Sequence, residues 1–376
     1  MLSKNMSLVF YVVVFIISLI LYYNRDSINI RYKTLNLKPT LILFYLLFII
    51  VFGFRYGVGT DYYNYQYLIQ NLIFNYTEPI NGLIYLIGNI TNYEQISFSI
   101  YVMLTLLLIV KAIDINFNDK RSQLYAMMFY LFIYFPHALN TVRESLAIAF
   151  MILSFSLLVC KKDIKYSLVL YLCALLTHNM VIIIAPVYLF YILNIRKIFI
   201  ILFYILFFMI VLLLAVCNSN IPLLSRITVY LEISNIDFGI GLFVIKIPLF
   251  IFITLIYFFI EDDKRIRYYS IISLSGVVLR HLSYVSFYFY RFANPFNIFN
   301  CFLVGYIPIL QSNIINFLNK EISYKNKDYF NKIMKFLNSE IFATISLLTI
   351  VIIYFIYEFY IGTTGEIMNY QLLFRR

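Results

Sequence analysis

The sequence predicts an all-α, polytopic integral membrane protein with about 10–12 transmembrane helices. Of its 376 residues, 63% are hydrophobic and only 12% are charged, roughly half the charged fraction of a soluble domain. Apolar runs recur from Val9 to Tyr360, so we expect a single transmembrane domain over residues 1–376. Lysines and arginines lie in short clusters between these runs, as in cytoplasmic loops. This placement argues against nucleic-acid binding despite the net charge of +11.

The individual spans follow from the length of each apolar run, because a crossing helix needs about 20 apolar residues. The candidate spans are Ser7–Tyr23, Pro39–Phe54, Ile96–Ala112, Gln123–Pro136, Asn140–Cys160, Phe199–Val216, Ile240–Phe259, Tyr268–Tyr290, Phe292–Gln311 and Ile341–Ile361. The stretch Tyr166–Leu193 is interrupted by Thr177-His178-Asn179 and is long for one crossing. We expect it to form a re-entrant or short-helix hairpin.

Loop charges set the orientation. With the N-terminus outside and the hairpin tip near His178 outside, most basic residues fall in inside loops. A single crossing at Tyr166–Leu193 would move the later basic clusters outside. The short run Ile80–Ile90 raises the same question, so we interpret it as a re-entrant or interfacial helix. The resulting layout has an outer loop 55–95, a hairpin 166–194, an outer loop 217–239 and a cytoplasmic loop 312–340.

Polar residues inside and beside the spans gather at the outer face of this layout. They are Arg55, Asp61, His137, Arg143, Glu144, His178 and Arg291. An ionisable group in a membrane segment is costly and marks function by default. A cluster on one side predicts a site that opens to the exterior.

The segment Arg55-Tyr-Gly57-Val-Gly59-Thr60-Asp61 predicts a tight turn. Two glycines let the backbone turn sharply, and successive amide N–H groups in such turns bind anions. Thr60 or Asp61 would cap the following helix. The alternative is a plain glycine turn with a snorkelling arginine.

Arg143 lies where a span enters the membrane from outside. Helix N-termini favour anions, so an arginine there suits a phosphate. Thr141 and Glu144 have capping-box spacing, which favours a structural role for Glu144.

Two further segments carry candidate site residues. His178, at the hairpin break, is either a packing residue or a base or proton donor. Arg280, Tyr284 and Arg291 share one helical face if Tyr268–Tyr290 is one helix, and guanidinium groups match phosphate oxygens. A lone arginine paired with a neighbouring helix is the alternative.

Motifs for metals and cofactors are not found in the sequence. It has no Walker loop, HExxH, GxSxG elbow or DxD-like acidic pair for a metal-bound nucleotide sugar, and its four cysteines lack metal or disulfide spacing. We therefore expect no metal and no cofactor. Catalysis would rest on arginine, histidine and single carboxylates.

Together these segments resemble the EpsG-type, Wzy-like exopolysaccharide and O-antigen polymerases. The first motif, Arg55 to Tyr65, is the most specific. Asn140-Thr-Val-Arg143-Glu-Ser-Leu-Ala147, Leu176-Thr-His178-Asn, Tyr290-Arg291-Phe and Asn369-Tyr370-Gln-Leu-Leu-Phe374 are similar to later family segments in the same order.

The resemblance implies a polymerase of undecaprenyl-diphosphate-linked repeat units at the outer face of the bacterial plasma membrane. Such enzymes resemble metal-independent GT-C-like glycosyltransferases, and chain-length regulators and flippases are the implied protein partners. The site residues would be Arg143 with Asp61 or His178 as base, and the substrate-binding set Arg55, Gly57, Gly59, Thr60, Arg280, Tyr284 and Arg291. A flippase of lipid-linked glycans and an O-antigen-ligase-like transferase are the alternatives.

Overall fold

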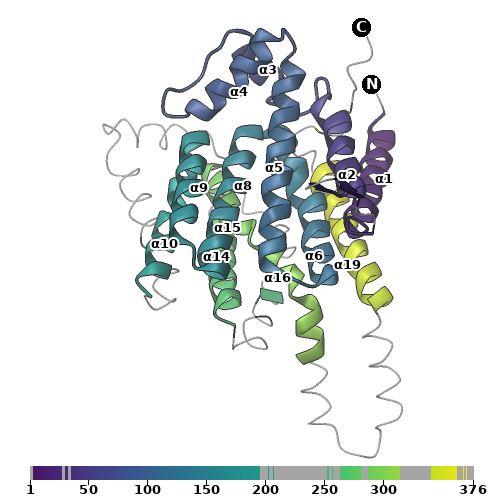
Figure 1. The fold of residues 1–376 in the computed structure, drawn as a ribbon, viewed down its shortest axis with the longest axis vertical. Coiled ribbons are helices and arrows are strands. Elements are labelled where there is room, and N and C mark those ends of the chain that lie inside the picture. The colour runs from purple at the N-terminus through teal and green to yellow at the C-terminus, as the bar shows by residue number, and fades with distance from the viewer. Residues whose placement is uncertain are drawn as a thin grey trace, which may run out of the picture. The chain divides into compact units, whose positions relative to one another are not determined.

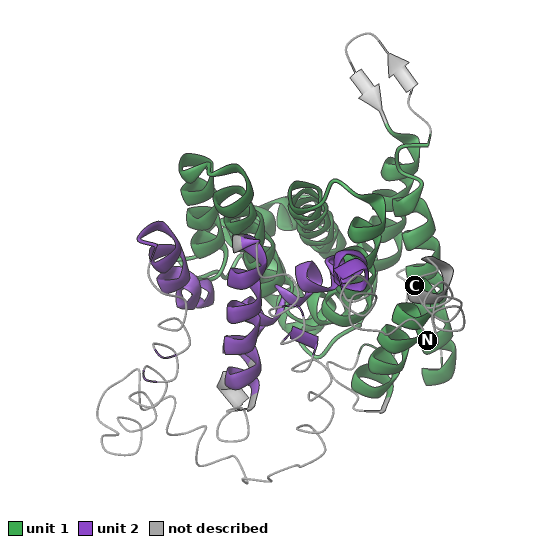
Figure 2. Ribbon diagram, turned by 90° about the horizontal axis from the view of Figure 1, so that it is seen from below, with its two compact units in different colours: residues 1–179, 317–376 green, residues 180–316 purple. Residues whose placement is uncertain are grey.

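The chain folds into two compact units (Figure 2). Unit 1 comprises residues 1–179 and 317–376, and unit 2 comprises residues 180–316. The computed structural model describes residues 3–27, 30–32, 35–194, 202, 206, 252–253, 256, 263–281, 287–313, 340–361, 367 and 370. This part is helical apart from one antiparallel hairpin, β1 (Ile30–Tyr32) with β2 (Leu35–Leu37), in which Ile30 pairs with Leu37.

Unit 1 is a bundle around α5 (Figure 1). Its described helices are α1 (Lys4–Tyr23), α2 (Pro39–Phe48), α3 (Tyr62–Gln70), α4 (Pro79–Ile90), α5 (Glu94–Asn116), α6 (Lys120–Phe129), α7 (Phe135–Asn140), α8 (Val142–Ser156), α9 (Ile164–Thr177) and α19 (Glu340–Phe355). Four π-helical segments continue α2, α6, α8 and α19: η1 (Ile49–Gly53), η2 (Tyr130–Tyr134), η3 (Leu157–Lys161) and η7 (Ile356–Ile361).

Three described helices are long and apolar enough to cross a membrane: Lys4–Tyr23, Glu94–Asn116 and Val142–Lys161. A fourth crossing is possible in unit 2, where Arg291–Gly305 and Ile307–Asn313 meet at 52°. These helices confirm the α-helical, multi-pass membrane class. The predicted spans Phe199–Val216 and Ile240–Phe259 lie outside the described residues, apart from single positions.

The short run predicted as re-entrant or interfacial forms the separate helix α4, which has 12 residues. At a rise of 1.5 Å per residue it is about 18 Å long, well short of the ~30 Å hydrocarbon core. Its length therefore rules out an ordinary crossing. Whether it is re-entrant or interfacial stays a prediction at this point.

Two buried arginines of unit 1, Arg55 and Arg25, lie near opposite ends of α5. Phe98, in the second turn of α5, lies under the Arg55 guanidinium, 4.8 Å from its ring centroid. Near the other end, Asp114 Oδ1 accepts a 2.6 Å hydrogen bond from Arg25 Nη2. The same nitrogen donates to Gln123 Oε1 at 2.7 Å, so it links the ends of α1 and α5 to the start of α6.

An aromatic cluster fills the interior between these two ends. Its members are Phe15, Phe48, Phe52, Phe132, Phe135 and Phe355, with ring centroids 4.8–6.1 Å apart. Tyr370 joins its edge, because its ring packs 4.4 Å from that of Phe10 and its hydroxyl donates to the Val51 carbonyl. The C-terminal segment thus returns to α1 and η1.

The stretch Tyr166–Leu193 breaks at His178, as predicted. α9 ends at Thr177, and His178 takes an extended conformation with φ −158° and ψ 119°. A 3-10 helix, η4 (Asn179–Ile184), and α10 (Ala185–Ile192) follow. At this break, the His178 side chain contacts Glu78, which directly precedes α4 in unit 1.

In unit 2, α14 (Lys264–His281) and α15 (Phe287–Asn297) pack as an antiparallel pair, followed by α16 (Asn300–Gly305). Gly276 faces Phe296 and Asn297 so closely that a Cβ would lie 2.5 Å from Asn297 Oδ1. Ser273, three residues before Gly276, donates a hydrogen bond to Asn300. Asn300 lies three residues after Asn297, so the two helices run antiparallel. The chain therefore reverses between the two helices, and the prediction of one helix over Tyr268–Tyr290 is wrong.

Candidate functional site

The turn that carries the first motif needs its two glycines. Gly57 has φ +61° and Gly59 has φ +95°, a region that side chains rarely adopt. A Cβ on Gly59 would also lie 3.1 Å from the carbonyl oxygen of Leu139. The turn therefore packs its backbone directly against the end of α7.

Arg55 is fully buried (0% exposed) beneath this turn. Its Nη1 donates to the Phe52 carbonyl at 2.7 Å and its Nη2 to the Leu139 carbonyl at 2.8 Å. Its Nε has no hydrogen-bond partner among the described residues. In this structure Arg55 ties the turn to α7, and its predicted contact with substrate stays a prediction.

Asn140 completes the contact between the first and second motifs. Its Oδ1 accepts from Thr60 Oγ1 at 2.7 Å and from the Asp61 N–H at 3.0 Å. Asp61 occupies the N-cap position of α3, but its side chain makes no cap hydrogen bond. The predicted cap by Thr60 or Asp61 is therefore wrong, because Asn140 binds the Thr60 hydroxyl and the Asp61 amide instead.

The predicted capping box at the start of α8 does not form either. Thr141 makes no side-chain cap, and its hydroxyl donates to the His137 carbonyl at 3.1 Å. The short helix α7 ends immediately before α8, so this carbonyl is within reach of Thr141. The Glu144 side chain on α8 is buried within unit 1.

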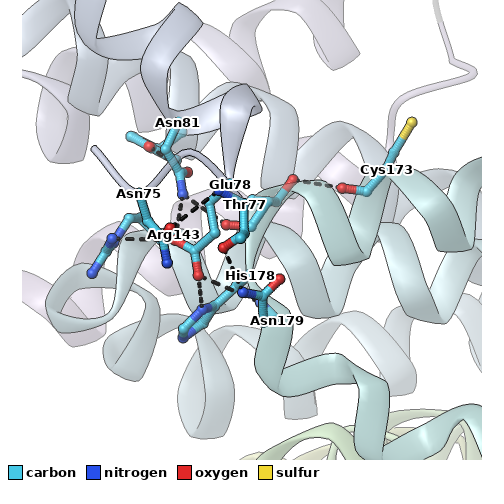
Figure 3. A network of polar contacts seen from close by, with 10 residues as sticks. Asn75, Thr77, Glu78, Asn81, Arg143, Cys173, His178 and Asn179 are labelled. Carbon is cyan, nitrogen blue, oxygen red and sulfur yellow. Dashed lines mark hydrogen bonds and ion pairs between the residues drawn. The ribbon is translucent and has the colours of Figure 1, made fainter. Parts of the chain in front are cut away.

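Arg143, Glu78 and His178 meet at one point of unit 1 (Figure 3). Arg143 Nη1 lies 3.3 Å from Glu78 Oε2, and His178 Nδ1 lies 2.8 Å from Glu78 Oε1. The three residues come from the start of α8, the start of α4 and the end of α9. One carboxylate thus joins a guanidinium and an imidazole from segments distant in the sequence.

Glu78 is buried and well supplied with donors. The Asn81 amide donates to Oε2 at 3.1 Å and the Asn179 N–H to Oε1 at 3.4 Å. Burial by itself raises the pKa of the Glu78 carboxyl, but the hydrogen bond and charge of His178 and the charge of Arg143 lower it below the ordinary value. Glu78 is therefore ionised at neutral pH.

A second layer of hydrogen bonds fixes this carboxylate. Tyr101 on α5 donates to Asn81 Oδ1 at 2.8 Å, and Asn81 Nδ2 also donates to the Thr177 carbonyl at 2.7 Å. Asn179 Nδ2 donates to Thr77 Oγ1 at 2.8 Å. These bonds lock the start of α4 to α5 and to the end of α9, so the cluster sits on rigid elements.

Arg143 and His178 remain accessible although Glu78 does not. Their side chains are 25% and 26% exposed, and the Arg143 guanidinium lies over the Tyr65 ring, 5.4 Å from its centroid. His178 Nδ1 is bonded to Glu78, and Nε2 has no partner among the described residues. The cluster can therefore bind an anion through Arg143 and accept a proton at Nε2.

Sequence reasoning missed Glu78. A signal was present in Thr77-Glu78-Pro79, where an acidic residue directly precedes a proline at a helix start. That signal predicts a helix boundary and gives no reason to expect a charged partner. Its partners lie 65 and 100 residues further along the chain.

The arginines of unit 2 lie on two helices. Arg280 is half-buried near the end of α14, and Arg291 is exposed on α15. The antiparallel register places both at the same end of this pair. Tyr284 lies outside the described residues. Of the other outer-face candidates, His137 Nε2 lies 3.4 Å from Glu358 Oε1 in unit 1.

The described residues contain no group of three or more His, Cys, Asp or Glu side chains placed to hold a metal ion.

No curated protein matches the chain, and no solved structure matches it either. A protein-family model, that of the EpsG family, matches residues 38–320. This range includes the Arg55 turn, Glu78, Arg143, His178, Arg280 and Arg291, but not the terminal segment at Tyr370.

The match covers well over half of the chain and agrees with the motifs quoted from the sequence. The length and apolar composition of the described helices independently indicate a multi-pass membrane protein. The chain therefore belongs to the EpsG family and is a membrane protein of polysaccharide biosynthesis.

Proposed function

We propose that this protein is a polysaccharide polymerase that joins undecaprenyl-diphosphate-linked oligosaccharide repeat units at the outer face of the plasma membrane. The observation that carries the proposal is the Glu78 carboxylate between Arg143 and His178. Glycosyl transfer from a lipid diphosphate needs a group that binds the leaving diphosphate and a base for the acceptor hydroxyl. The cluster offers one of each.

Arg143 is proposed to bind the diphosphate. Its guanidinium is accessible, lies at the start of α8, and is held from one side by Glu78 and from another by Tyr65. A guanidinium fork matches phosphate oxygens, and the helix N-terminus adds a favourable dipole. Such preorganised donors stabilise charge that develops in the transition state.

His178 is proposed as the general base. In the neutral form of His178, Nδ1–H donates to the Glu78 carboxylate, and the Nε2 lone pair is left for the substrate. In the reaction, Nε2 takes the proton of an acceptor sugar hydroxyl while its oxygen bonds to the anomeric carbon of the donor. The bond from that carbon to the diphosphate oxygen breaks, and its electron pair leaves with the diphosphate towards Arg143.

Asp61 remains the alternative base. Its side chain is half-buried and makes no hydrogen bond or ion pair within the described part of the chain. It lies close in the sequence to Thr60, which is anchored to Asn140. His178 is preferred because the Glu78 carboxylate orients its ring. The Asp61 carboxylate has no comparable partner among the described residues.

The remaining predicted site residues take supporting roles in this proposal. Arg55, Gly57, Gly59 and Thr60 hold the turn against α7 and Asn140, and thereby fix the start of α8 that carries Arg143. Arg280, Tyr284 and Arg291 are proposed as further substrate contacts in unit 2. Neither role requires a metal or a cofactor.

A flippase of lipid-linked glycans is the second candidate. It would move the same substrates without forming a glycosidic bond, so it needs no base. The carboxylate-oriented histidine favours the polymerase. An O-antigen-ligase-like transferase would use the same chemistry with a different acceptor.

Purified full-length protein decides between these activities. A polymerase incubated in detergent with lipid-linked repeat units and a chelator should produce a ladder of lengthening glycans. Detergent removes sidedness and ion gradients, so transport cannot generate such a product. Protein that forms no ladder yet moves the units across liposome bilayers would reject the polymerase in favour of the flippase.

A further inference from the structure

Helix α4 presents a stripe of aliphatic side chains with no protein cover in unit 1. Leu83, Leu86, Ile87 and Ile90 are 63%, 41%, 44% and 70% exposed. Their spacing of i, i+3, i+4 and i+7 places them on one face of the helix. A run of exposed aliphatic residues on a single face marks a surface that something covers.

The opposite face of α4 is fixed by close packing, so the stripe cannot turn inward. A Cβ on Gly88 would lie 2.2 Å from Ser97 Oγ, and one on Gly82 would lie 2.7 Å from the Phe74 ring. Ser97 Oγ also donates to the Ile84 carbonyl at 2.8 Å. Rotation of α4 would break these contacts with α5 and with the segment before α4.

The surroundings of the stripe match a membrane interface. No charged residue occurs within Pro79–Ile90. Exposed tyrosines lie on the adjoining segments at positions 63, 67, 76 and 93. Because the chain contains no tryptophan, tyrosine is the residue expected at the lipid–water boundary. A protein-binding surface would more often combine apolar residues with polar and charged groups at its rim.

Helix α4 also contacts a helix that has an exposed aliphatic face of its own. α4 packs against α9 (Figure 1), whose exposed face carries Ile164, Leu168, Val169 and Leu172. α4 itself is too short to cross a bilayer. A short helix with one face packed on protein and an aliphatic face exposed fits a position in the plane of the interface.

We propose that the aliphatic stripe of α4 docks onto the acyl-chain boundary of the outer leaflet. Glu78 directly precedes α4, and its carboxylate holds Arg143 and His178. The docked helix therefore sets the depth of the cluster at the level of lipid headgroups, where the diphosphate of a lipid-linked substrate lies. Docking is independent of the proposed function, and only this consequence for catalysis rests on it.

Single tryptophan substitutions test the docking without any label, because the native chain has no tryptophan. Leu83→Trp and Ile87→Trp proteins in liposomes should be quenched by lipids brominated on the acyl chains and shielded from aqueous iodide. Gln70→Trp, at an exposed polar position of α3, is the matched control and should show the reverse. Quenching of Ile87→Trp by iodide as strong as that of Gln70→Trp would overturn the inference. Shielding from both quenchers would overturn it too, since a protein would then cover the stripe.

The consequence for catalysis has a separate test. Leu83→Gln with Ile87→Gln should slow polymerisation in liposomes by about tenfold and leave the rate in detergent unchanged. The volume-conserving pair Leu83→Ile with Ile87→Leu should behave as wild type in both. An unchanged rate of the glutamine pair in liposomes would reject the depth-setting role. A wild-type protein inactive in both media would reject the proposed function, while the tryptophan experiment would still decide the docking.

Discussion

Two arginines that lie near the same end of unit 1, Arg55 and Arg143, have different surroundings. Arg55 is fully buried, bonded to the carbonyls of Phe52 and Leu139, and stacked on Phe98. Arg143 is a quarter exposed, and its described ion pair is with a side-chain carboxylate, Glu78. A guanidinium whose N–H groups bind backbone carbonyls stabilises the fold, whereas one oriented by a carboxylate has further N–H groups available for a ligand. The comparison distinguishes an arginine that supports the fold from one that we propose binds the substrate.

The link between the two arginines is the break between α7 and α8. Arg55 binds the Leu139 carbonyl, and Asn140 binds Thr60 and the Asp61 amide. Arg143 follows three residues after Asn140. The first motif therefore fixes the backbone from which Arg143 projects, and in our proposal this is how it supports the site.

The largest effect is expected at His178. His178→Gln should lower the polymerisation rate by about 10²–10⁴-fold, the usual contribution of a general base, while the protein accumulates normally. His137→Gln is the matched control, because His137 also pairs with a glutamate, Glu358, but outside the cluster. The rate of ladder formation per folded molecule is the readout. An equal loss in both variants would remove the special role of His178.

A smaller effect, on folding and not on chemistry, is expected at Arg55. Arg55→Lys loses the fork that reaches two carbonyls and should lower the free energy of unfolding by about 2–4 kcal/mol. Thermal unfolding in detergent measures this, with Arg121→Lys on α6 as the control. Activity per folded molecule should fall less than tenfold. A stable Arg55→Lys protein without activity would place Arg55 among the substrate contacts.

The smallest effect concerns the pH dependence of stability at Glu78. Its pKa is lowered on folding, so its contribution is present above the ordinary glutamate pKa of ~4.3. It is lost as the pH falls through the lower folded value. Glu78→Gln should therefore be less stable than wild type at neutral pH by about 1–3 kcal/mol, and the gap should close in acid. A gap that is constant with pH would contradict the charged pairing.

The sequence predicts those features that depend on local signals. The break at His178 follows from a polar triplet in an apolar stretch, and the tight turn follows from Gly57 and Gly59, both of which have positive φ. Arg143 is correctly placed at a helix start. Each of these follows from neighbours a few residues away.

The errors and the omission come from contacts that local signals do not carry. The run from His281 to Phe287 has no glycine or proline, so no local turn signal indicates that the chain reverses between α14 and α15. The caps at Thr60, Asp61 and Thr141 were displaced by Asn140 and by the His137 carbonyl. Glu78 was overlooked because its role depends on residues of α8 and α9.

The central claim, that the accessible arginine of the cluster binds the diphosphate, is tested most directly at Arg143. Purified Arg143→Lys protein keeps the positive charge beside Glu78 but loses the bidentate fork. With lipid-linked repeat units in detergent, we expect wild-type thermal stability and a polymerisation rate reduced by about 10²-fold or more. A glycan ladder formed at the wild-type rate and length would contradict the account, and Arg143 would then be only an anchor for Glu78.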